Sequence, residues 1–195
     1  MAASLSERKQ ATRGRILDAA EALIKARGSE ATTVEAVMRR AGLTVGGFYA
    51  HFPSKEALAQ EALIRGVERS IAELTAGLDD HAPAAFAKHL IRRYLAQVES
   101  PDLERACPLT LLLPEVARAE PPFRATFAAR TGELIATIEQ RLPPIDDMPP
   151  REVALALFAT LAGAVSFAYA ASTRRGRRRI AAAAEASLHR WLGLP

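Results

Sequence analysis

The distribution of proline is the feature that most constrains how this chain can fold. All 12 prolines lie at or after Pro53, so no proline interrupts a helix in the first 52 residues. Beyond that point, prolines stand where helices are expected to begin, as at Pro83, Pro121 and Pro149. The pattern predicts a division near residue 54, into an N-terminal domain of residues 1–54 and a second domain of residues 55–195.

Hydrophobic periodicity predicts the same kind of secondary structure on both sides of this division. Apolar residues recur with a helical period, Ala and Leu are abundant, and neither Asn-Gly nor Asp-Gly, the usual hairpin turns, occurs. No segment alternates between polar and apolar residues for long. We therefore expect an all-α protein of about nine helices, three of them in the N-terminal domain.

Two short helices joined by a tight turn are expected between residues 33 and 52. The first begins at a capping threonine, Thr32 or Thr33, and ends at the turn Gly42-Leu43-Thr44. Thr44 then caps the second helix, which carries two apolar anchors, Phe48 and Phe52. Two helices joined in this way are typical of a helix-turn-helix.

Positive charge gathers in the same part of the sequence. Residues 1–55 hold nine Lys and Arg against five Asp and Glu, whereas residues 56–195 hold 17 of each. The whole formal charge of +4 therefore lies in the first part. This asymmetry favours an anionic partner for the N-terminal domain, although a solvated basic face would give the same count.

Residues 31–58, ATTVEAVMRRAGLTVGGFYAHFPSKEAL, resemble the N-terminal DNA-binding domain of the TetR family of bacterial repressors. The resemblance spans Thr12 to Leu63, because Ile16-Leu17-Asp18-Ala19-Ala20 matches the first helix of that domain. The family often has Ser or Thr where this chain has Gly47. The expected recognition helix of this chain therefore carries two adjacent glycines, Gly46 and Gly47. The resemblance implies double-stranded operator DNA as a partner, a homodimer, and a small-molecule effector.

The resemblance also implies which residues touch DNA. Thr33 would contact a phosphate at the start of its helix, and Lys55 would supply a second phosphate contact. The plainer alternatives are a helix cap and a solvated lysine. His51 and Tyr49 lie off the apolar face and would reach the backbone or a base edge. The expected DNA-binding residues are Thr33, Thr44, Val45, Gly46, Gly47, Tyr49, His51 and Lys55.

The recognition segment holds no Arg, Asn or Gln, which constrains how it could distinguish bases. Readout is expected to rest on contacts of Val45 or Ala50 with thymine methyl groups and on hydroxyl bonds from Thr44 and Tyr49. Adjacent glycines weaken a free helix by about 1 kcal/mol each, so they indicate a close approach, either to DNA or to the first helix. Four arginines can add contacts or be ordinary surface charges: Arg13, Arg15, Arg39 and Arg40.

Near the C-terminus, residues 153–173 carry no charge, and five arginines follow within residues 174–179. The length suits a membrane span, but the content of Ala, Gly and Ser favours close packing of two helices over lipid. With residues 180–191 beside it, this segment is expected to form half of a two-fold, four-helix interface. We expect no membrane partner, and we expect the arginines to form a solvated connecting loop.

A small-molecule site is expected in the second domain, where the family usually has a mostly apolar cavity. Each candidate residue also suits a place in the core. Cys107 allows two interpretations, a sensor of electrophiles or a buried small hydrophobe. The expected ligand-binding residues are Phe86, His89, Tyr94, Phe123, Phe127, Phe158 and Tyr169.

The patterns of enzymes are missing from the sequence. The four histidines show no metal-ligand spacing, and there is no phosphate-binding loop or nucleophile elbow, so we expect no catalytic residue, metal site or cofactor. Residues 1–9 lack the apolar run of a signal peptide, so we expect a cytoplasmic protein. The sequence predicts a transcriptional repressor released by a small apolar or aromatic ligand. The alternative is a helical small-molecule-binding or partner-binding protein without DNA-binding activity.

Overall fold

The structure, a computed structural model, describes residues 5–100 and 102–195. Within these ranges the regular elements are helices and no β-strand forms, which confirms the all-α expectation. The helices in chain order are α1 (Leu5–Arg27), α2 (Val34–Arg40), η1 (Val45–Ala50), α3 (Lys55–Thr75), α4 (Pro83–Leu95), η2 (Ala96–Glu99), η3 (Leu103–Arg105), α5 (Pro108–Leu111), α6 (Leu113–Arg118), α7 (Pro121–Glu139), α8 (Pro150–Tyr169) and α9 (Arg174–Trp191).

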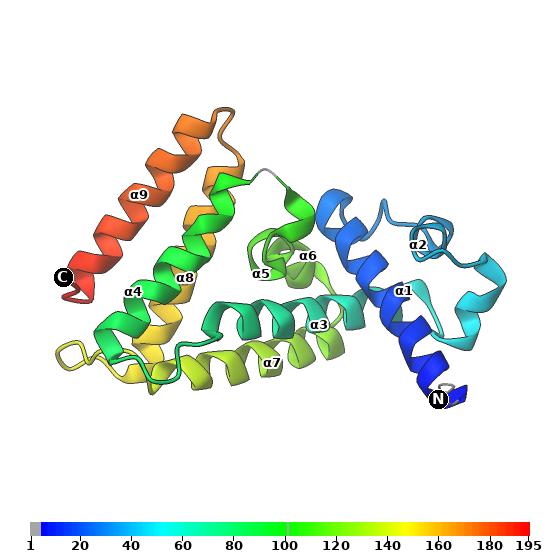
Figure 1. Cartoon of the computed structure of the whole chain (residues 1–195), viewed down its shortest axis with the longest axis horizontal. Helices are drawn as coiled ribbons and strands as arrows, with labels where there is room; N and C mark the ends of the chain where they lie inside the picture. The colour runs from blue at the N-terminus through cyan, green and yellow to red at the C-terminus, as the bar shows by residue number, and fades with distance from the viewer. Residues whose placement is uncertain (1–4, 101) are drawn as a thin grey trace.

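The helices are arranged along one long axis (Figure 1). α1, α2 and η1 form one end, α4, α8 and α9 form the other, and the short helices α5 and α6 lie between them. α3 and α7 run side by side along the axis, and α3 packs against α1 as well as against α7. α3 is therefore one route by which a change at one end can reach the other.

A small apolar core holds the three helices at the N-terminal end. Ile16 of α1 and Phe48 of η1 are fully buried, and Phe52 just after η1 is 1% exposed. The Phe48 and Phe52 rings stack with their centroids 5.9 Å apart, and the Arg13 guanidinium lies 4.5 Å from the Phe52 centroid. Burying one such ring contributes about 1.5–3 kcal/mol. These anchors fix the inner face of η1, so its other face is presented to solvent in one orientation.

Side-chain caps set where several helices begin. The hydroxyl oxygen of Thr33 accepts a hydrogen bond from the backbone N–H of Ala36 at 3.2 Å, so Thr33 and not Thr32 caps α2. Ser54 caps α3 in the same way through Ala57 at 3.1 Å. The expected cap at Thr44 is wrong, because its side chain makes no capping bond and the segment after it is a 3₁₀-helix rather than an α-helix. The two adjacent glycines that follow Thr44 leave this segment little intrinsic preference for the α-helix.

The expected arginine loop is also wrong, since residues 174–179 form the first turns of α9. Thr173 caps this helix by accepting a hydrogen bond from the N–H of Gly176 at 3.0 Å. Arginines at a helix N-terminus oppose the helix dipole. Glu99 compensates, because its carboxylate accepts hydrogen bonds from Arg174 at 2.8 Å and from Arg178 at 2.7 and 2.8 Å. A partner this distant in sequence could not be read from the local pattern.

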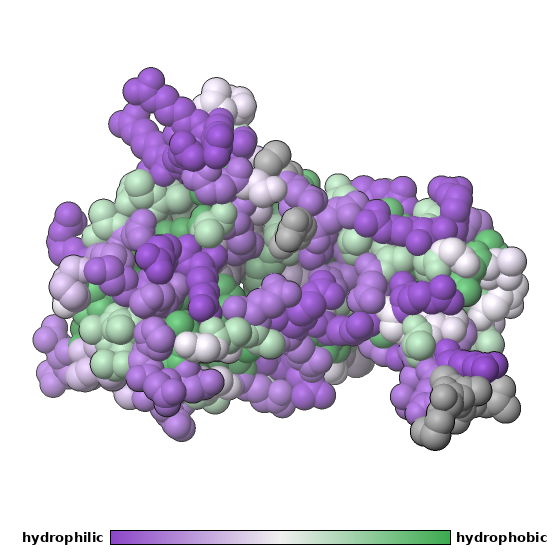
Figure 2. All heavy atoms as spheres, viewed as in Figure 1, coloured by the Kyte–Doolittle hydropathy of each residue, from purple (hydrophilic) through white to green (hydrophobic). Residues whose placement is uncertain are grey.

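α8 has one buried face and one exposed face, both uncharged along most of its length. Val153, Leu157 and Leu161 are buried, whereas Leu155 is 49% exposed and Phe167 is 69% exposed. By length and composition, α8 is the one helix in the described ranges that could cross a membrane. Hydrophilic residues cover most of the face in Figure 2, and apolar residues form small patches on it.

Candidate nucleic-acid interface

The exposed face of η1 is the centre of the candidate interface. Its apolar anchor Phe48 is fully buried, whereas Val45 is 43% exposed and Tyr49 is 74% exposed. Thr44 and Gly46 are exposed on the same segment. The edge of the Tyr49 ring meets the Phe48 ring at a centroid distance of 5.1 Å. The expected base-reading residues are therefore on the surface, on a segment whose inner face is fixed by the core.

The packing around the two glycines distinguishes the two explanations for them. A Cβ built on Gly46 would meet no described atom within 4 Å, and one on Gly47 would meet only the Met38 Cε of α2, at 3.9 Å. That distance is an ordinary van der Waals contact. Packing against α1 therefore does not require glycine at either position. Close approach of an outside molecule to the backbone at these glycines stays a prediction.

Thr33 is a cap that also interacts with a neighbouring carboxylate. Hydrogen bonds from the backbone N–H of Glu35 and from the Thr33 hydroxyl lower the pKa of the Glu35 carboxyl. The threonine is exposed, so a phosphate could reach its hydroxyl only by replacing Glu35. The structural role of Thr33 is thus clear, and its phosphate contact stays a prediction.

Lys55 has a role that neither sequence interpretation anticipated. Its Nζ donates hydrogen bonds to the carbonyl oxygens of Ser29 and Glu30, each at 3.3 Å. These bonds tie the start of α3 to the turn between α1 and α2. A partner 25 residues away gives no local signal, which is why the sequence could not reveal it. A phosphate contact by Lys55 stays a prediction.

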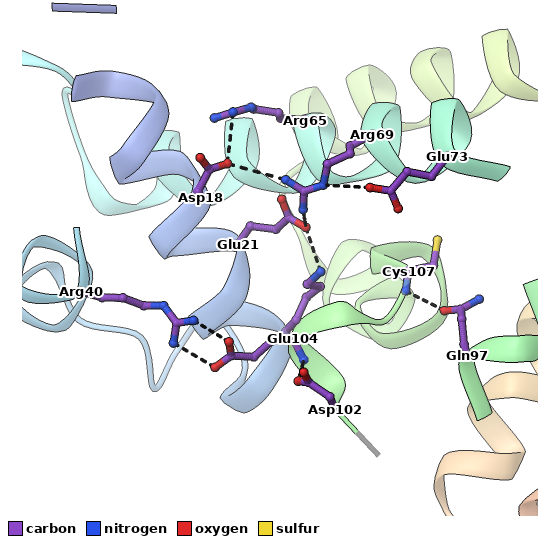
Figure 3. A network of polar contacts seen from close by, with 11 residues as sticks. Asp18, Glu21, Arg40, Arg65, Arg69, Glu73, Gln97, Asp102, Glu104 and Cys107 are labelled. Carbon is purple, nitrogen blue, oxygen red and sulfur yellow. Dashed lines mark hydrogen bonds and ion pairs between the residues drawn. The ribbon is translucent and has the colours of Figure 1, made fainter. Parts of the chain in front are cut away.

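The four arginines that could add DNA contacts fall into two groups. Arg13 pairs with Glu61. Figure 3 shows the pair that Arg40 forms with Glu104. Arg15 and Arg39 are exposed and form no ion pair with any residue in the described ranges. The latter two arginines are the better candidates for additional DNA contacts.

His51 follows η1 and is partly buried. Its Nδ1 is buried without a hydrogen-bond partner in the described part of the chain.

A network of ion pairs fixes α1 to α3 behind the interface (Figure 3). Arg65 lies 3.1 Å from Asp18, and Glu21 pairs with both Arg69 and Lys25. The Glu21 and Lys25 side chains are 3% and 4% exposed, so removal of either one would leave an uncompensated buried charge. This network attaches α1 to α3 at Arg65 and Arg69, near the middle of α3.

Gly66 is the position on α3 where this close packing requires glycine. A Cβ there would lie 2.8 Å from the Glu21 Cδ of α1 and 2.9 Å from the Pro108 Cγ of α5. α1, α3 and α5 thus meet at one point.

The expected ligand-binding residues do not gather around one cavity. Phe86 and Tyr94 are fully buried, with the Arg141 guanidinium 4.1 Å from the Phe86 centroid and the Tyr94 hydroxyl 2.9 Å from the Thr110 hydroxyl. Phe158 meets the Tyr94 ring edge-on at 6.0 Å. These three residues contribute to the core, and their contact with a ligand stays a prediction.

The other four ligand candidates are dispersed. His89 bonds the Ala85 carbonyl through Nδ1 at 2.8 Å, and Phe127 is buried beside Phe123. Phe123 lines a cleft of about 350 Å³ near α6, whereas Tyr169 lines a separate one of about 200 Å³ near η2.

Cys107 lies in the core and is 4% exposed. Burial raises the pKa of its thiol, which disfavours the thiolate that reacts with electrophiles. The geometry favours the interpretation of Cys107 as a small buried hydrophobe.

Comparison with known proteins adds to this geometry. Residues 16–62 match the family described as "Bacterial regulatory proteins, tetR family". A segment of 63 residues is 36% identical to the HTH-type transcriptional regulator UidR of Escherichia coli strain K12 and covers 32% of each chain. Another of 64 residues is 45% identical to the HTH-type transcriptional repressor KstR of Mycolicibacterium smegmatis and covers 33% of this chain and 31% of KstR. The match thus spans about a third of the length of these curated relatives.

The whole fold also has a solved counterpart. A TetR transcriptional regulator from Chloroflexus aurantiacus J-10-fl superposes with a TM-score of 0.76 and 26% identity. The superposition covers 93% of this chain and 96% of that chain. The similarity therefore includes the helices beyond residue 62, where the sequence match to the family ends.

Proposed function

This chain belongs to the TetR family of bacterial regulatory proteins, and we propose that it is a cytoplasmic, DNA-binding transcriptional repressor that a small ligand releases from its operator. The observation that carries the proposal is the exposed face of η1. Tyr49 is 74% exposed while its neighbour Phe48 is fully buried. Val45 is 43% exposed on the same segment, so η1 presents apolar and hydroxyl groups to a partner while Phe48 fixes its inner face in the core.

We propose that this face enters the major groove. Val45 would contact a thymine methyl group, and the hydroxyls of Thr44 and Tyr49 would bond base edges or phosphates. Gly46 and Gly47 would let the backbone approach the DNA. Thr33, His51 and Lys55 would contact the flanking phosphates, which fix register without reading sequence.

We propose that residues 1–54 bind DNA and that residues 55–195 dimerise and bind the effector. The exposed face of α8 supports the dimer, because Leu155 and Phe167 are both solvent-exposed there and Gly163 lies between them. A second copy would cover this uncharged face. Two recognition segments would then engage half-sites about one helical turn of DNA apart.

Release by a ligand follows from linkage between the two domains. A ligand can release the operator only if it binds more tightly to the conformation that cannot hold DNA. Each tenfold loss of operator affinity requires about 1.4 kcal/mol of that preference. Candidate contacts for an apolar or aromatic ligand remain Phe86, His89, Tyr94, Phe123, Phe127, Phe158 and Tyr169. α3 supports such a linkage, because it packs against α1 and α7 alike.

Footprinting of the purified protein on DNA flanking its own gene tests the proposal. We expect a protected palindrome whose affinity falls for Tyr49→Phe and stays unchanged for Tyr169→Phe, at the C-terminal residue of α8. Lys55→Ala should lower the salt slope by about 0.9 for each phosphate that the lysine no longer neutralises, or roughly two per dimer. Absence of protection on genomic fragments would instead favour the helical ligand-binding or partner-binding protein without DNA-binding activity.

A further inference from the structure

A cleft opens where the helix-turn-helix meets the rest of the molecule. It has a volume of about 350 Å³ and lies between the turn after α1, the start of α3, and the region from α6 to the start of α7. Its apolar side chains include Ile24, Leu63, Leu112, Val116 and Phe123. Of the aromatic residues expected to bind a ligand, Phe123 alone lines it. A cleft of this volume with an apolar lining falls within the range of small-molecule sites.

The charges on this cleft favour one sign of ligand. Four glutamates line it, namely Glu30, Glu56, Glu115 and Glu120, against two cations, Lys55 and Arg118. The Lys55 ammonium is engaged with the carbonyls of Ser29 and Glu30. The Glu56 carboxylate accepts hydrogen bonds from the Glu56 backbone N–H and from the Ser54 hydroxyl. These bonds lower the pKa of the Glu56 carboxyl, so Glu56 is ionised at neutral pH. The cleft is thus net negative around an apolar surface.

We propose that this cleft binds an amphipathic organic cation, an ammonium or amidinium group attached to an apolar or aromatic body. The body would pack on Leu63, Val116 and Phe123, and the cationic group would sit among the rim carboxylates. An anionic ligand of the same shape would bring a second negative charge among the glutamates and find Arg118 as its main partner. Charge complementarity therefore sets the class of ligand.

Two polar contacts beside the cleft tie it to the helix-turn-helix. The Glu115 carboxylate accepts the backbone N–H of Ser29 at 3.2 and 3.3 Å, and Lys55 donates to the carbonyl of the same residue at 3.3 Å. A cation that attracts Glu115 weakens its bond to Ser29 and loosens the turn between α1 and α2. The bound cation then changes operator affinity. This last step rests on the proposed function, whereas binding in the cleft does not.

Three probes with one apolar body and different charges test binding to the full-length protein. We would titrate 4-phenylbutylamine, 4-phenylbutanol and 4-phenylbutyrate by calorimetry at neutral pH. Saturable binding is expected for the amine, weaker binding for the alcohol, and binding at least tenfold weaker than the amine for the carboxylate. No binding of the amine, or equal binding of amine and carboxylate, overturns the proposal.

Variants locate the bound amine. Ala119→Trp should fill the cleft and abolish binding, whereas Ala128→Trp, on the exposed surface of α7, should leave it unchanged. Glu120→Gln avoids the risk of misfolding and should weaken amine binding about two- to fivefold, with no effect on the alcohol. Glu152→Gln on α8 is the control for removal of a negative charge. Wild-type binding by both Ala119→Trp and Glu120→Gln would mean that the amine binds elsewhere.

Operator affinity measured with and without the amine tests the coupling step. We expect the amine to change the dissociation constant, and we expect Glu115→Gln to reduce that change. Unaltered affinity with the cleft saturated overturns the coupling while leaving the binding site established. A protein that binds no DNA at all would overturn the proposed function, and the calorimetric titrations would still decide whether the cleft is a cation site.

Discussion

The two ends of this molecule each expose an uncharged helical face, but the chemistry of the two faces differs. The exposed residues of η1 are Val45, Gly46, Tyr49 and Ala50, and Tyr49 among them carries a hydroxyl group. On α8 the exposed face carries Leu155 and Phe167 around small residues such as Gly163. Exposure alone therefore does not identify a partner. The first face can form hydrogen bonds and admit a close backbone, whereas the second has apolar area to bury.

The ends also differ in how they are held to the body of the molecule. Arg65 and Arg69 of α3 pair with Asp18 and Glu21 of α1, and within α1 Glu21 also pairs with Lys25, where both side chains are almost fully buried. At the other end, the described ion pairs of α9 are solvent-exposed and join Arg174 and Arg178 to Glu99. Buried pairs are costly to break and exposed pairs contribute little, so the two ends should respond to substitution with very different magnitudes.

The largest effect is expected from a charge on the α8 face. In the proposed dimer, Gly163→Glu would bury two unpaired carboxylates near the two-fold axis, at a cost of several kcal/mol. A Cβ at Gly163 meets no described atom within 4 Å, so the single chain should keep its helical content. Sedimentation should show a monomer, and operator affinity should fall about a hundredfold or more because two half-sites no longer bind together.

The control for this charge is Ala125→Glu, at an exposed position of α7. It should remain dimeric and bind the operator normally. A Gly163→Glu protein that stays dimeric with tight operator binding would show that the interface lies elsewhere.

A smaller effect is expected where α1, α3 and α5 meet. Gly66→Ala would force a Cβ to within 3 Å of Glu21 and Pro108, so we expect net destabilisation of about 1–2 kcal/mol in urea unfolding. Gly163→Ala is the matched helical control, and it should be neutral or stabilising in a monomeric background because its Cβ is unobstructed. Equal stability of the two variants would mean that the packing at Gly66 relaxes without cost.

Substitutions of the two glycines of η1 should change DNA binding without weakening the fold. Gly46→Ala and Gly47→Ala should leave the free energy of unfolding unchanged or raise it by about 0.5–1 kcal/mol, since neither Cβ is obstructed. Operator affinity, measured by fluorescence anisotropy, should nevertheless fall, because the added methyl groups would stand between backbone and DNA. Full affinity in both variants would leave the adjacent glycines without a role in recognition.

The sequence predicted what is local in this structure. The cap at Thr32 or Thr33, the turn at Gly42 and the buried anchors Phe48 and Phe52 each rest on a few neighbouring residues. The helical start of α9 was missed because the repulsion among its arginines is relieved by Glu99, far away in the sequence.

The cleft and the position of Lys55 were missed for the same kind of reason. Lys55 bonds the carbonyls of Ser29 and Glu30, and Glu115 reaches Ser29 from another part of the chain. Phe86 and Tyr94, which the sequence offered both as ligand contacts and as core residues, are fully buried, and their contact with a ligand stays a prediction. Periodicity identifies which residues are buried, but it cannot distinguish a cavity wall from a packed interior.

The smallest effect is expected at the exposed ion pairs of α9, as a dependence on pH. Hydrogen bonds from Arg178 and Arg174 lower the pKa of the Glu99 carboxyl from 4.5 to about 2. Because the folded-state pKa is the lower one, the contribution of Glu99 to stability is fully present above pH 4.5 and is lost as the pH falls towards 2. The free energy of unfolding, measured in urea, should therefore fall more steeply with decreasing pH for wild type than for Glu99→Gln across this range. Glu185→Gln on α9 provides the control for removal of one negative charge, and its stability should stay closer to that of wild type. Parallel curves for wild type and Glu99→Gln would mean that solvent screening cancels the pairing.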